Sequence, residues 1–304
     1  MMRRHVRHLV IAGLLIAAGL GWSGCGIAAF GLNARYSEEL DWTLDGVGVV
    51  AIDAQTSNGA IRFTATDSPR VVVRAVKTVR ARNEKQAKAF AQQVKIRVER
   101  EGNRVRIVKE HPRPPRHVNL AVRYDIRAPG DVDVTFRTSN GAIQILGVAG
   151  RVEALTSNGA IELQGGRGEV NLHTSNGRIT FRGVTGQIHV QTSNGAIEGA
   201  VTSLTGESVF STSNGSIDLT IEEGITPLTA TTSNGNIDVV LPTDFSGRLD
   251  ARTSNGRVRS DFPVLMRVKE SPSHKNRLVG QIGEGVGPLV TLRSSNGSIH
   301  LGAH

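Results

Sequence analysis

Residues 138–181 carry one short motif three times at a fixed spacing; they read TSNGAIQILGVAGRVEALTSNGAIELQGGRGEVNLHTSNGRITF. The three Thr-Ser-Asn-Gly copies lie 18 residues apart, and an Ile stands three residues after each Asn. A unit this short cannot bury its own apolar face, so a fixed period near 20 is typical of chains that stack their repeats into one continuous core. The rest of the chain extends this pattern in both directions.

Ser-Asn-Gly occurs nine times, preceded by Thr in eight copies and by Ser294 in the last. Successive spacings are 82, 18, 18, 18, 20, 20, 21 and 41 residues, and 41 equals two periods, so we expect two coils there with one motif lost. The repeated asparagines are Asn58, Asn140, Asn158, Asn176, Asn194, Asn214, Asn234, Asn255 and Asn296.

Apolar residues alternate with polar ones on both sides of each motif. Six and four residues before the Asn, and three and five residues after it, the side chains are mostly large and apolar, and the third position after it is Ile or Val in every copy. Alternation of period two predicts two strands per repeat, each with one buried face. The Gly of the motif lies between them, where we expect a positive φ to turn the corner.

Asn-Gly between alternating apolar residues is also the strongest hairpin signal, so an antiparallel β-sandwich or barrel is the alternative. A hairpin, however, gives no reason for the accompanying Thr, Ser and Ile. In stacked parallel coils identical residues lie about 4.8 Å apart, so each Asn can hydrogen-bond to the next. We therefore predict an all-β fold with a parallel β-solenoid over residues 132–302, right-handed being the more usual hand, in which the nine asparagines form a structural ladder.

The 82-residue interval predicts an N-terminal β segment over residues 47–131 with one inserted helix. Asn83 can cap a helix that starts at Glu84, and apolar residues follow at helical spacing to about residue 95. Alternating strands flank this helix on both sides. We expect the first repeat to start the solenoid, and the helix to be an insertion or a cap over its end.

The N-terminus has the profile of a secretory signal. Residues 1–8 hold three arginines, and residues 9–32 hold no charged residue. The apolar run ends at Gly24-Cys25, which resembles the lipobox of bacterial lipoproteins, although Trp22 replaces the usual Leu. We predict a signal peptide over 1–24, lipidation at Cys25 and a lipid-anchored linker over 25–46. An uncleaved transmembrane helix and an ordinary soluble secreted protein are the alternatives.

Either anchored form places the chain outside the cytoplasm. Because Gly26 and not Asp follows the cysteine, we expect the outer membrane or the cell surface rather than the inner membrane.

The composition limits the partners. A single cysteine excludes a disulfide framework, and 4% aromatic residues are too few for a nucleic-acid stacking platform. The net charge of +9 and the basic clusters at residues 113–117 and 267–277 suggest anionic envelope glycans or lipid headgroups, beside the membrane itself or an envelope protein. We expect no nucleic acid and no cofactor.

Two groups of side chains are candidate metal-binding or catalytic sites. Glu198, Asp218 and Asp238 occupy equivalent positions in consecutive repeats and could hold a cation or act on a polysaccharide, but a solvated strand face of mixed charge is the favoured explanation. His173 and His189 could be diagonal neighbours, although no third metal ligand is apparent. The repeated serines argue for architecture, since a catalytic serine needs one base in one place. We predict no catalytic and no metal-binding residues.

The chain resembles the bacterial putative-adhesin family, a domain family of unknown function that repeats Thr-Ser-Asn-Gly. The resemblance covers about residues 47–301 and rests on Thr56-Ser57-Asn58-Gly59, the helix after it, the run of repeats, and the closing GQIGEG and LRSSNGSIHL. It implies a non-catalytic, envelope-associated β-solenoid with an adhesin-like or structural binding surface. An envelope-stress sensory or regulatory partner, or a polysaccharide-modifying β-helix enzyme, are the alternatives.

Overall fold

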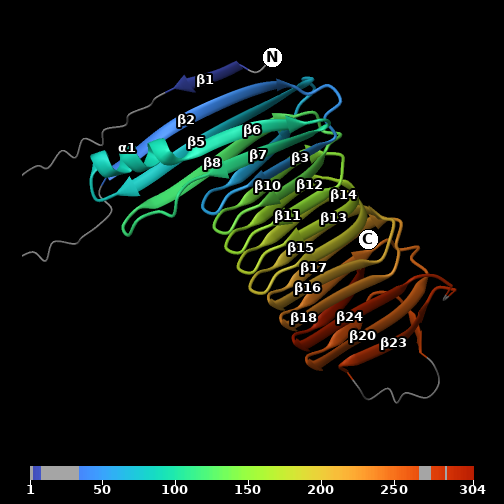
Figure 1. Cartoon of the computed structure of the whole chain (residues 1–304). Coiled ribbons are helices and arrows are strands. Elements are labelled where there is room, and N and C mark those ends of the chain that lie inside the picture. Colours follow the sequence, from blue (N-terminus) through green and yellow to red (C-terminus); the bar gives the residue numbers. More distant parts are fainter. Residues whose placement is uncertain (1–2, 8–33, 267–274, 285) are drawn as a thin grey trace, which may run out of the picture.

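The structure is a computed structural model that describes residues 3–7, 34–266, 275–284 and 286–304 (Figure 1). Cys25, almost all of the expected signal peptide and residues 267–274 of the second basic cluster lie outside these ranges. The described residues form 25 strands and one helix. The predictions of an all-β fold and of a single inserted helix are confirmed.

Each repeat contributes one strand before its motif and one after it. The strands before the motif are β3 (Ala51–Gln55), β9 (Asp133–Arg137), β11 (Val152–Leu155), β13 (Arg167–His173), β16 (Ser208–Asn214), β18 (Leu228–Asn234), β20 (Gly247–Asn255) and β24 (Leu289–Asn296). The strands after it are β4 (Ile61–Ala65), β10 (Ile143–Val148), β12 (Ile161–Gly165), β15 (Ile197–Leu204), β17 (Ile217–Glu223), β19 (Ile237–Leu241), β21 (Val258–Ser260) and β25 (Ile299–Ala303). One long strand, β14 (Ile179–Gln191), serves both faces by pairing with β12 at its start and with β13 and β16 further on.

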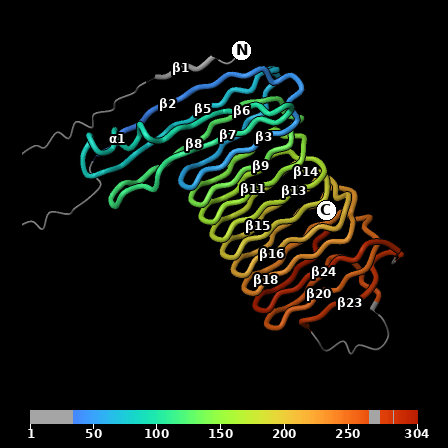
Figure 2. Tube along the Cα trace, viewed as in Figure 1, coloured from blue at the N-terminus to red at the C-terminus, as the bar shows by residue number. Residues whose placement is uncertain are grey.

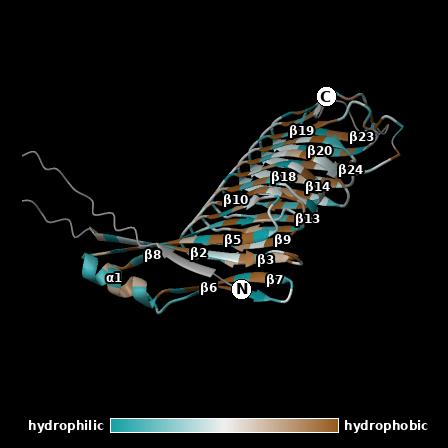
Figure 3. Cartoon of the chain, turned by 90° about the horizontal axis from the view of Figure 1, so that it is seen from above, coloured by the Kyte–Doolittle hydropathy of each residue, from teal (hydrophilic) through white to brown (hydrophobic). Residues whose placement is uncertain are grey.

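Equivalent residues of neighbouring repeats stand opposite each other. Strands of adjacent repeats pair in parallel, and Ile143, Ile161 and Ile179 form one column of register partners. Polar and apolar residues alternate along the strands (Figure 3). The apolar set faces inward and is buried, which gives one core that runs the length of the stack. Among the described strands, antiparallel pairing is confined to the two ends of the molecule.

The last repeat does not lie at the end of the stack. Its strand β24 pairs in parallel with β18 on one side and with β20 on the other, so the repeat of Asn296 lies between those of Asn234 and Asn255 (Figure 2). The expectation of two coils within the 41-residue interval is wrong. That interval instead holds β22 (Val264–Met266) and β23 (Arg277–Ile282), which form an antiparallel pair along the free edge of β20.

The N-terminal end is built from the 82-residue insertion. Strands β3 and β4 pair directly with β9 and β10, so the first repeat joins the stack despite its distance in sequence. Beyond it, one face is extended by β7 (Arg104–Glu110) and β6 (Lys95–Glu101), and the other by β8 (Asn119–Ala128), β5 (Arg70–Ala81), β2 (Ala34–Asp45) and β1 (Arg3–Arg7).

Two elements here differ from the expected boundaries. Strand β2 begins at Ala34, within the segment expected to be a linker, because residues 34–45 pair antiparallel with β5 along its whole length. The helix α1 (Glu84–Gln93) starts where expected and ends two residues early. The Asn83 side chain caps it by accepting a hydrogen bond from the Gln86 backbone N–H at 2.8 Å. At ten residues, α1 is the one helix of the described ranges and is too short to cross a membrane.

Candidate functional site

The repeated asparagines form one continuous chain of side-chain hydrogen bonds. Each Asn donates from Nδ2 to the Oδ1 of its neighbour toward the N-terminal end of the stack, at 2.7–2.9 Å. The chain starts at Asn255 and passes through Asn296 before it reaches Asn234. At the other end, Asn58 donates to the Leu120 carbonyl at 3.2 Å. All nine predicted ladder residues are thus brought together.

The threonines of the motif also bond between repeats. Thr174 is buried and donates to the carbonyl of Gly159 in the preceding repeat at 3.0 Å, and the other interior copies repeat this bond. Ser294 replaces the last Thr with the same bond to Gly235. A buried hydroxyl needs such a partner, because burial without one costs free energy.

The glycines are required by close stacking and not by backbone conformation. Among the nine motif glycines only Gly59 has a positive φ, so the expectation of a left-handed corner is wrong for the others. A Cβ atom built on Gly177 would lie 2.0 Å from the carbonyl oxygen of Gly159. Successive corners approach so closely that only hydrogen fits between them. The Thr and Asn side chains of the motif therefore form hydrogen bonds between repeats, and the Gly allows the close approach of the backbones.

The acidic column does not form a metal cluster. The register places Glu198 opposite Asp218 and Asp218 opposite Asp238, as expected from the spacing. Neighbouring groups occupy each carboxylate: Arg178 pairs with Glu198 at 3.1 Å, Ser216 donates to Asp218 at 2.7 Å, and His300 lies 3.3 Å from Asp238. The described residues hold no group of three or more His, Cys, Asp or Glu side chains arranged to bind a metal.

His173 and His189, the candidate metal pair, are diagonal neighbours on the paired strands β13 and β14. His189 faces Asn171, with 3.3 Å between Nδ1 and Oδ1, and His173 faces Gln191. The first basic cluster, at residues 113–117, is an exposed loop for most of its length. The two histidines line one hollow of about 570 Å³ together with Glu153 and Gln191.

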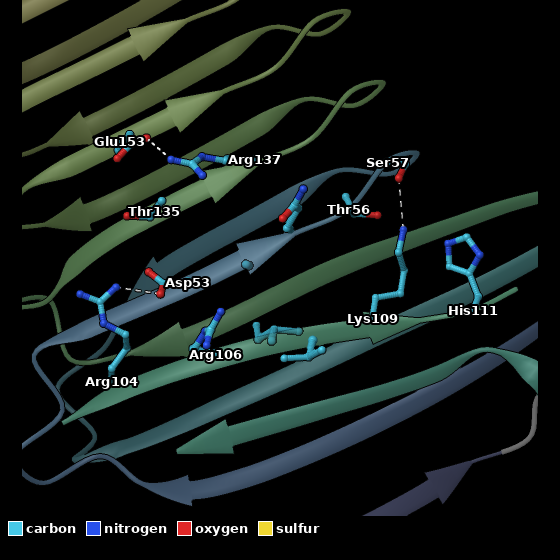
Figure 4. A pocket seen from close by; sticks show the side chains of 14 residues that line it. Asp53, Thr56, Ser57, Arg104, Arg106, Lys109, His111, Thr135, Arg137 and Glu153 are labelled. Atoms are coloured by element: carbon cyan, nitrogen blue, oxygen red, sulfur yellow. Dashed lines mark hydrogen bonds and ion pairs between the residues drawn. The ribbon is translucent and has the colours of Figure 1, made fainter. Parts of the chain in front are cut away.

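A polar groove lies where the stack meets the N-terminal extension (Figure 4). It has a volume of about 650 Å³, and strands β7, β3, β9 and β11 supply its walls. The charged side chains that line it are Asp53, Arg104, Arg106, Lys109, Arg137 and Glu153. Four cations thus face two carboxylates, which leaves a surplus of two positive charges.

Two of the arginines are held by the two acids. Arg104 donates to Asp53 at 2.8 Å, and Arg137 donates to Glu153 at 2.6 Å. Each of these bonds uses a single N–H of a guanidinium that carries five. Arg106 of β7 is the register partner of Asp53, and its ion pair is with Glu101, outside the groove, at 3.6 Å.

Lys109 differs from the arginines because no carboxylate of the described residues pairs with it. Its ammonium group reaches the hydroxyl of Ser57 at 3.5 Å, over the corner of the first repeat (Figure 4). Burial lowers the pKa of Lys109, since the surroundings remove water without supplying an opposite charge.

His111 stands beside Lys109 and is fixed in orientation. Its Nδ1 lies 2.8 Å from the Pro112 carbonyl, which can only accept, so Nδ1 donates and Nε2 is left for another partner. The ring also packs edge-on against Phe90 of α1, with the ring centroids 6.5 Å apart. The helix insertion therefore supports one end of the groove.

The groove was not predicted from the sequence. Two of its basic residues, Arg104 and Arg106, alternate with apolar ones, which is typical of an ordinary strand with one solvated face, and Lys109 follows two apolar residues and breaks this alternation. Only the parallel pairing of β7 with β3, more than 50 residues away in sequence, brings them beside Asp53 and Ser57.

Comparison with known proteins gives a family match. The family model described as Toastrack DUF4097 matches residues 49–302. No curated protein matches the chain.

Several solved structures are similar to the chain at low identity. A putative adhesin from Bacteroides fragilis is 13% identical, with 90% of this chain and 98% of that chain covered and a TM-score of 0.42. A putative adhesin from Parabacteroides merdae is 11% identical, with 89% and 97% covered and a TM-score of 0.45. A protein from Parabacteroides distasonis described as a putative lipid binding protein is 11% identical, with 89% and 98% covered and a TM-score of 0.39.

Proposed function

This chain belongs to the Toastrack DUF4097 family, and on that premise we propose that it is a non-catalytic binding protein of the cell envelope. Its stack acts as a rigid support, a right-handed parallel β-solenoid, and its side chains outside the repeated motif provide the binding surface. The parallel pairing of equivalent residues in neighbouring repeats supports the solenoid.

The observation that carries the binding role is the contrast between the motif and the groove. Thr, Asn and Gly of the motif are used in bonds and close contacts between repeats. The groove side chains instead keep hydrogen-bond donors and a positive charge surplus that the two acids of the groove leave unbalanced. Such a set of convergent polar groups in a hollow is what a ligand site requires.

A non-catalytic role is favoured by the surroundings of the acidic column. General acid–base catalysis needs two positioned groups near one substrate bond. The column of Glu198, Asp218 and Asp238 lies on a strand face where Arg178, Ser216 and His300 already engage it.

We place the protein outside the cytoplasm, tethered to the outer membrane or the cell surface through a lipid on Cys25, with residues 1–24 removed as a signal peptide. Nine residues separate Cys25 from the start of β2 at Ala34, a contour length of at most about 32 Å. The start of β2 would then stay within that distance of the anchor. Removal of residues 1–24 would also take away β1 and leave β2 as a sheet edge.

The test of the tether is Cys25→Ser, followed by fractionation of membranes and soluble envelope contents. We expect the variant in the soluble fraction and the parent protein in the membrane fraction. Membrane retention of the variant with an uncleaved leader would instead establish a transmembrane anchor.

A polysaccharide-modifying enzyme is the second candidate, and the acidic column is the observation behind it. Products of acidic polysaccharide cleavage should be absent with the parent protein, with or without calcium. Cleavage that disappears on replacing Glu198, Asp218 and Asp238 by Gln, Asn and Asn would reverse the non-catalytic assignment. A sensory or regulatory role would show as a specific envelope protein cross-linked to the chain in cells.

A further inference from the structure

We infer that the groove between β7 and the first repeats binds an acidic polysaccharide through its carboxylate groups, with Lys109 and Arg106 as the principal contacts. This inference rests on the proposed binding function and names its ligand class. It is carried by four features of the groove: an uncompensated ammonium group, arginines held in a fixed orientation, two carboxylates on the same wall, and its length.

The ammonium group of Lys109 is the first feature. It is half-buried, its one polar side-chain contact in the described residues is the Ser57 hydroxyl at 3.5 Å, and burial lowers its pKa. A cation kept partly out of water without a counter-ion is unfavourable in the free protein. A ligand carboxylate at this point would supply the missing charge, and the Ser57 hydroxyl lies beside it to donate a further hydrogen bond.

The arginines provide donors in fixed positions. Asp53 and Glu153 hold Arg104 and Arg137 against the strands, which reduces the rotamer freedom that ligand binding must remove. The guanidinium N–H groups outside those two bonds can donate to ligand oxygens. Arg106, with only a 3.6 Å contact to Glu101, has the weakest internal partner of the three.

The two carboxylates favour a polysaccharide over a membrane surface. A bilayer of anionic lipids presents a continuous negative surface, which Asp53 and Glu153 would repel. An acidic polysaccharide presents carboxylates separated by hydroxyl groups, and those hydroxyls can donate to Asp53 and Glu153. The alternation of cation and acid in the groove therefore matches a sugar chain with spaced charges.

The length of the groove favours a polymer over a single small anion. Arg104 and Lys109 are five residues apart on one extended segment, a separation of about 17 Å between their backbone positions. Cations spread over that length can meet several charged groups of one chain, and their contributions then act together.

The experiment measures binding of detergent-extracted full chain to three probes: polygalacturonate, its methyl ester, and vesicles of phosphatidylglycerol. We expect binding to polygalacturonate that weakens with salt, because surface charges are screened within about 3 Å at 1 M. The methyl ester, which keeps the sugar backbone but lacks the charge, should bind at least about tenfold more weakly, a difference of ~1.4 kcal/mol.

The matched variants separate the groove from total charge. The double variant Lys109→Gln, Arg106→Gln should lose at least about tenfold in affinity for polygalacturonate. The double variant Lys88→Gln, Arg248→Gln removes the same charge from exposed positions outside the groove and should bind as the parent does. Lys109→Arg, which keeps the charge, should retain binding, and circular dichroism of each variant shows whether it folds.

Four results would overturn the inference: equal binding of the methyl ester, unchanged affinity of the groove variant, an equal loss in the control variant, or tighter binding to vesicles that depends on Lys109. The last result would assign the groove to the membrane. None of them affects the tether, because Cys25→Ser is read by fractionation. Failure of the groove proposal and failure of the tether proposal are therefore distinguishable.

Discussion

At the scale of single residues, the tightest constraint in the stack is the contact between successive motif glycines. Gly177 has no positive φ, yet a Cβ on it would lie 2.0 Å from the Gly159 carbonyl oxygen, and Gly195 approaches Gly177 as closely. Its role is therefore the spacing of the repeats.

Gly177→Ala should destabilise the protein by about 2–4 kcal/mol, because backbone must move apart in two repeats to admit the methyl group. Gly168→Ala is the matched control: it has φ +81 and open space around the new Cβ, so only backbone strain of about 1 kcal/mol applies. Urea unfolding of both variants checks the order. A larger loss for Gly168→Ala would show that conformation, and not spacing, selects glycine here.

The asparagine ladder should contribute less per residue than the glycine contacts. Asn176 donates to Asn158 and accepts from Asn194, at 2.8 Å in both cases, but its side chain is exposed. Asn176→Ala should cost about 1 kcal/mol, since water can replace the partners of the two neighbouring amides. Asn255→Ala removes one bond at the start of the ladder and should cost about half as much. Equal thermal midpoints for Asn176→Ala and the parent would contradict a structural role for the ladder.

At the scale of elements, helix α1 is joined to its sheet by a buried cation. Lys77 of β5 donates to the carbonyls of Ala91 and Val94 at the end of the helix, at 2.8 and 3.2 Å, and pairs with Glu38 of β2 at 2.8 Å. These carbonyls lie at the end of the helix, where Ala91 also accepts from the Val94 backbone N–H at 3.2 Å.

Lys77→Met should cost about 3–5 kcal/mol, because it leaves the Glu38 carboxylate buried without a partner. Hydrogen exchange should show faster exchange in residues 84–94. Glu38→Gln added to Lys77→Met removes the stranded charge and should recover part of the loss. An unchanged exchange rate in α1 would show that the apolar contacts of the helix suffice to hold it.

The C-terminal strands contain a pH-sensitive contact. Loss of water around the ring lowers the pKa of His300. Hydrogen bonds to Asp261 and Asp238 raise it by more, so the pKa lies above its ordinary value of 6.5. Arg259, the register partner of His300 on β21, is the cation facing it. A raised folded pKa stabilises the fold fully below pH 6.5, and this contribution is lost as pH rises through the folded value.

The thermal midpoint of the parent should therefore fall more between about pH 5.5 and about pH 8.5 than that of His300→Gln. Asp261→Asn, which keeps the histidine and one of its two carboxylates, should show an intermediate fall. Parallel pH curves for all three proteins would contradict the contact.

The sequence predicts the pairing of a strand only where both paired strands flank a Thr-Ser-Asn-Gly motif. The columns of equivalent residues follow from period and parity alone, and the helix start follows from Asn83 and its apolar spacing. Strand β2 was missed because its pairing with β5 is long-range and carries no repeated signature. The groove was missed for the same reason, since it depends on where β7 pairs. The order of the last repeat was hidden because all repeats offer equivalent edges.

At the scale of the whole molecule, the C-terminal repeat makes the core continuous between the repeats of Asn234 and Asn255. Strands β24 and β25 fill a space bounded by β18 and β20 on one face and by β19 and β21 on the other. Their apolar residues Val290, Leu292, Ile299 and Leu301 are buried there.

Deletion of residues 288–304 should therefore expose four strand edges and yield a protein that self-associates in size-exclusion chromatography. A synthetic peptide of residues 288–304 added in trans should restore the monomer, whereas the same peptide with Val290→Asp and Ile299→Asp should not. A monomeric deletion variant with the parent's thermal midpoint would show that β20 closes the stack without the last repeat.

The position of that repeat also constrains the order in which strands can pair while the chain folds. Asn255 precedes Asn296 by 41 residues, so a chain that emerges from its N-terminal end presents β20 before β24. During that interval β18 and β20 both have open edges with the same motif, and direct pairing between them would satisfy the asparagine and threonine bonds in register. The last repeat would then have no place to enter. The uniformity of the repeats thus creates a competing misassembled isomer, and the native arrangement requires β20 to wait for, or give way to, a segment synthesised after it.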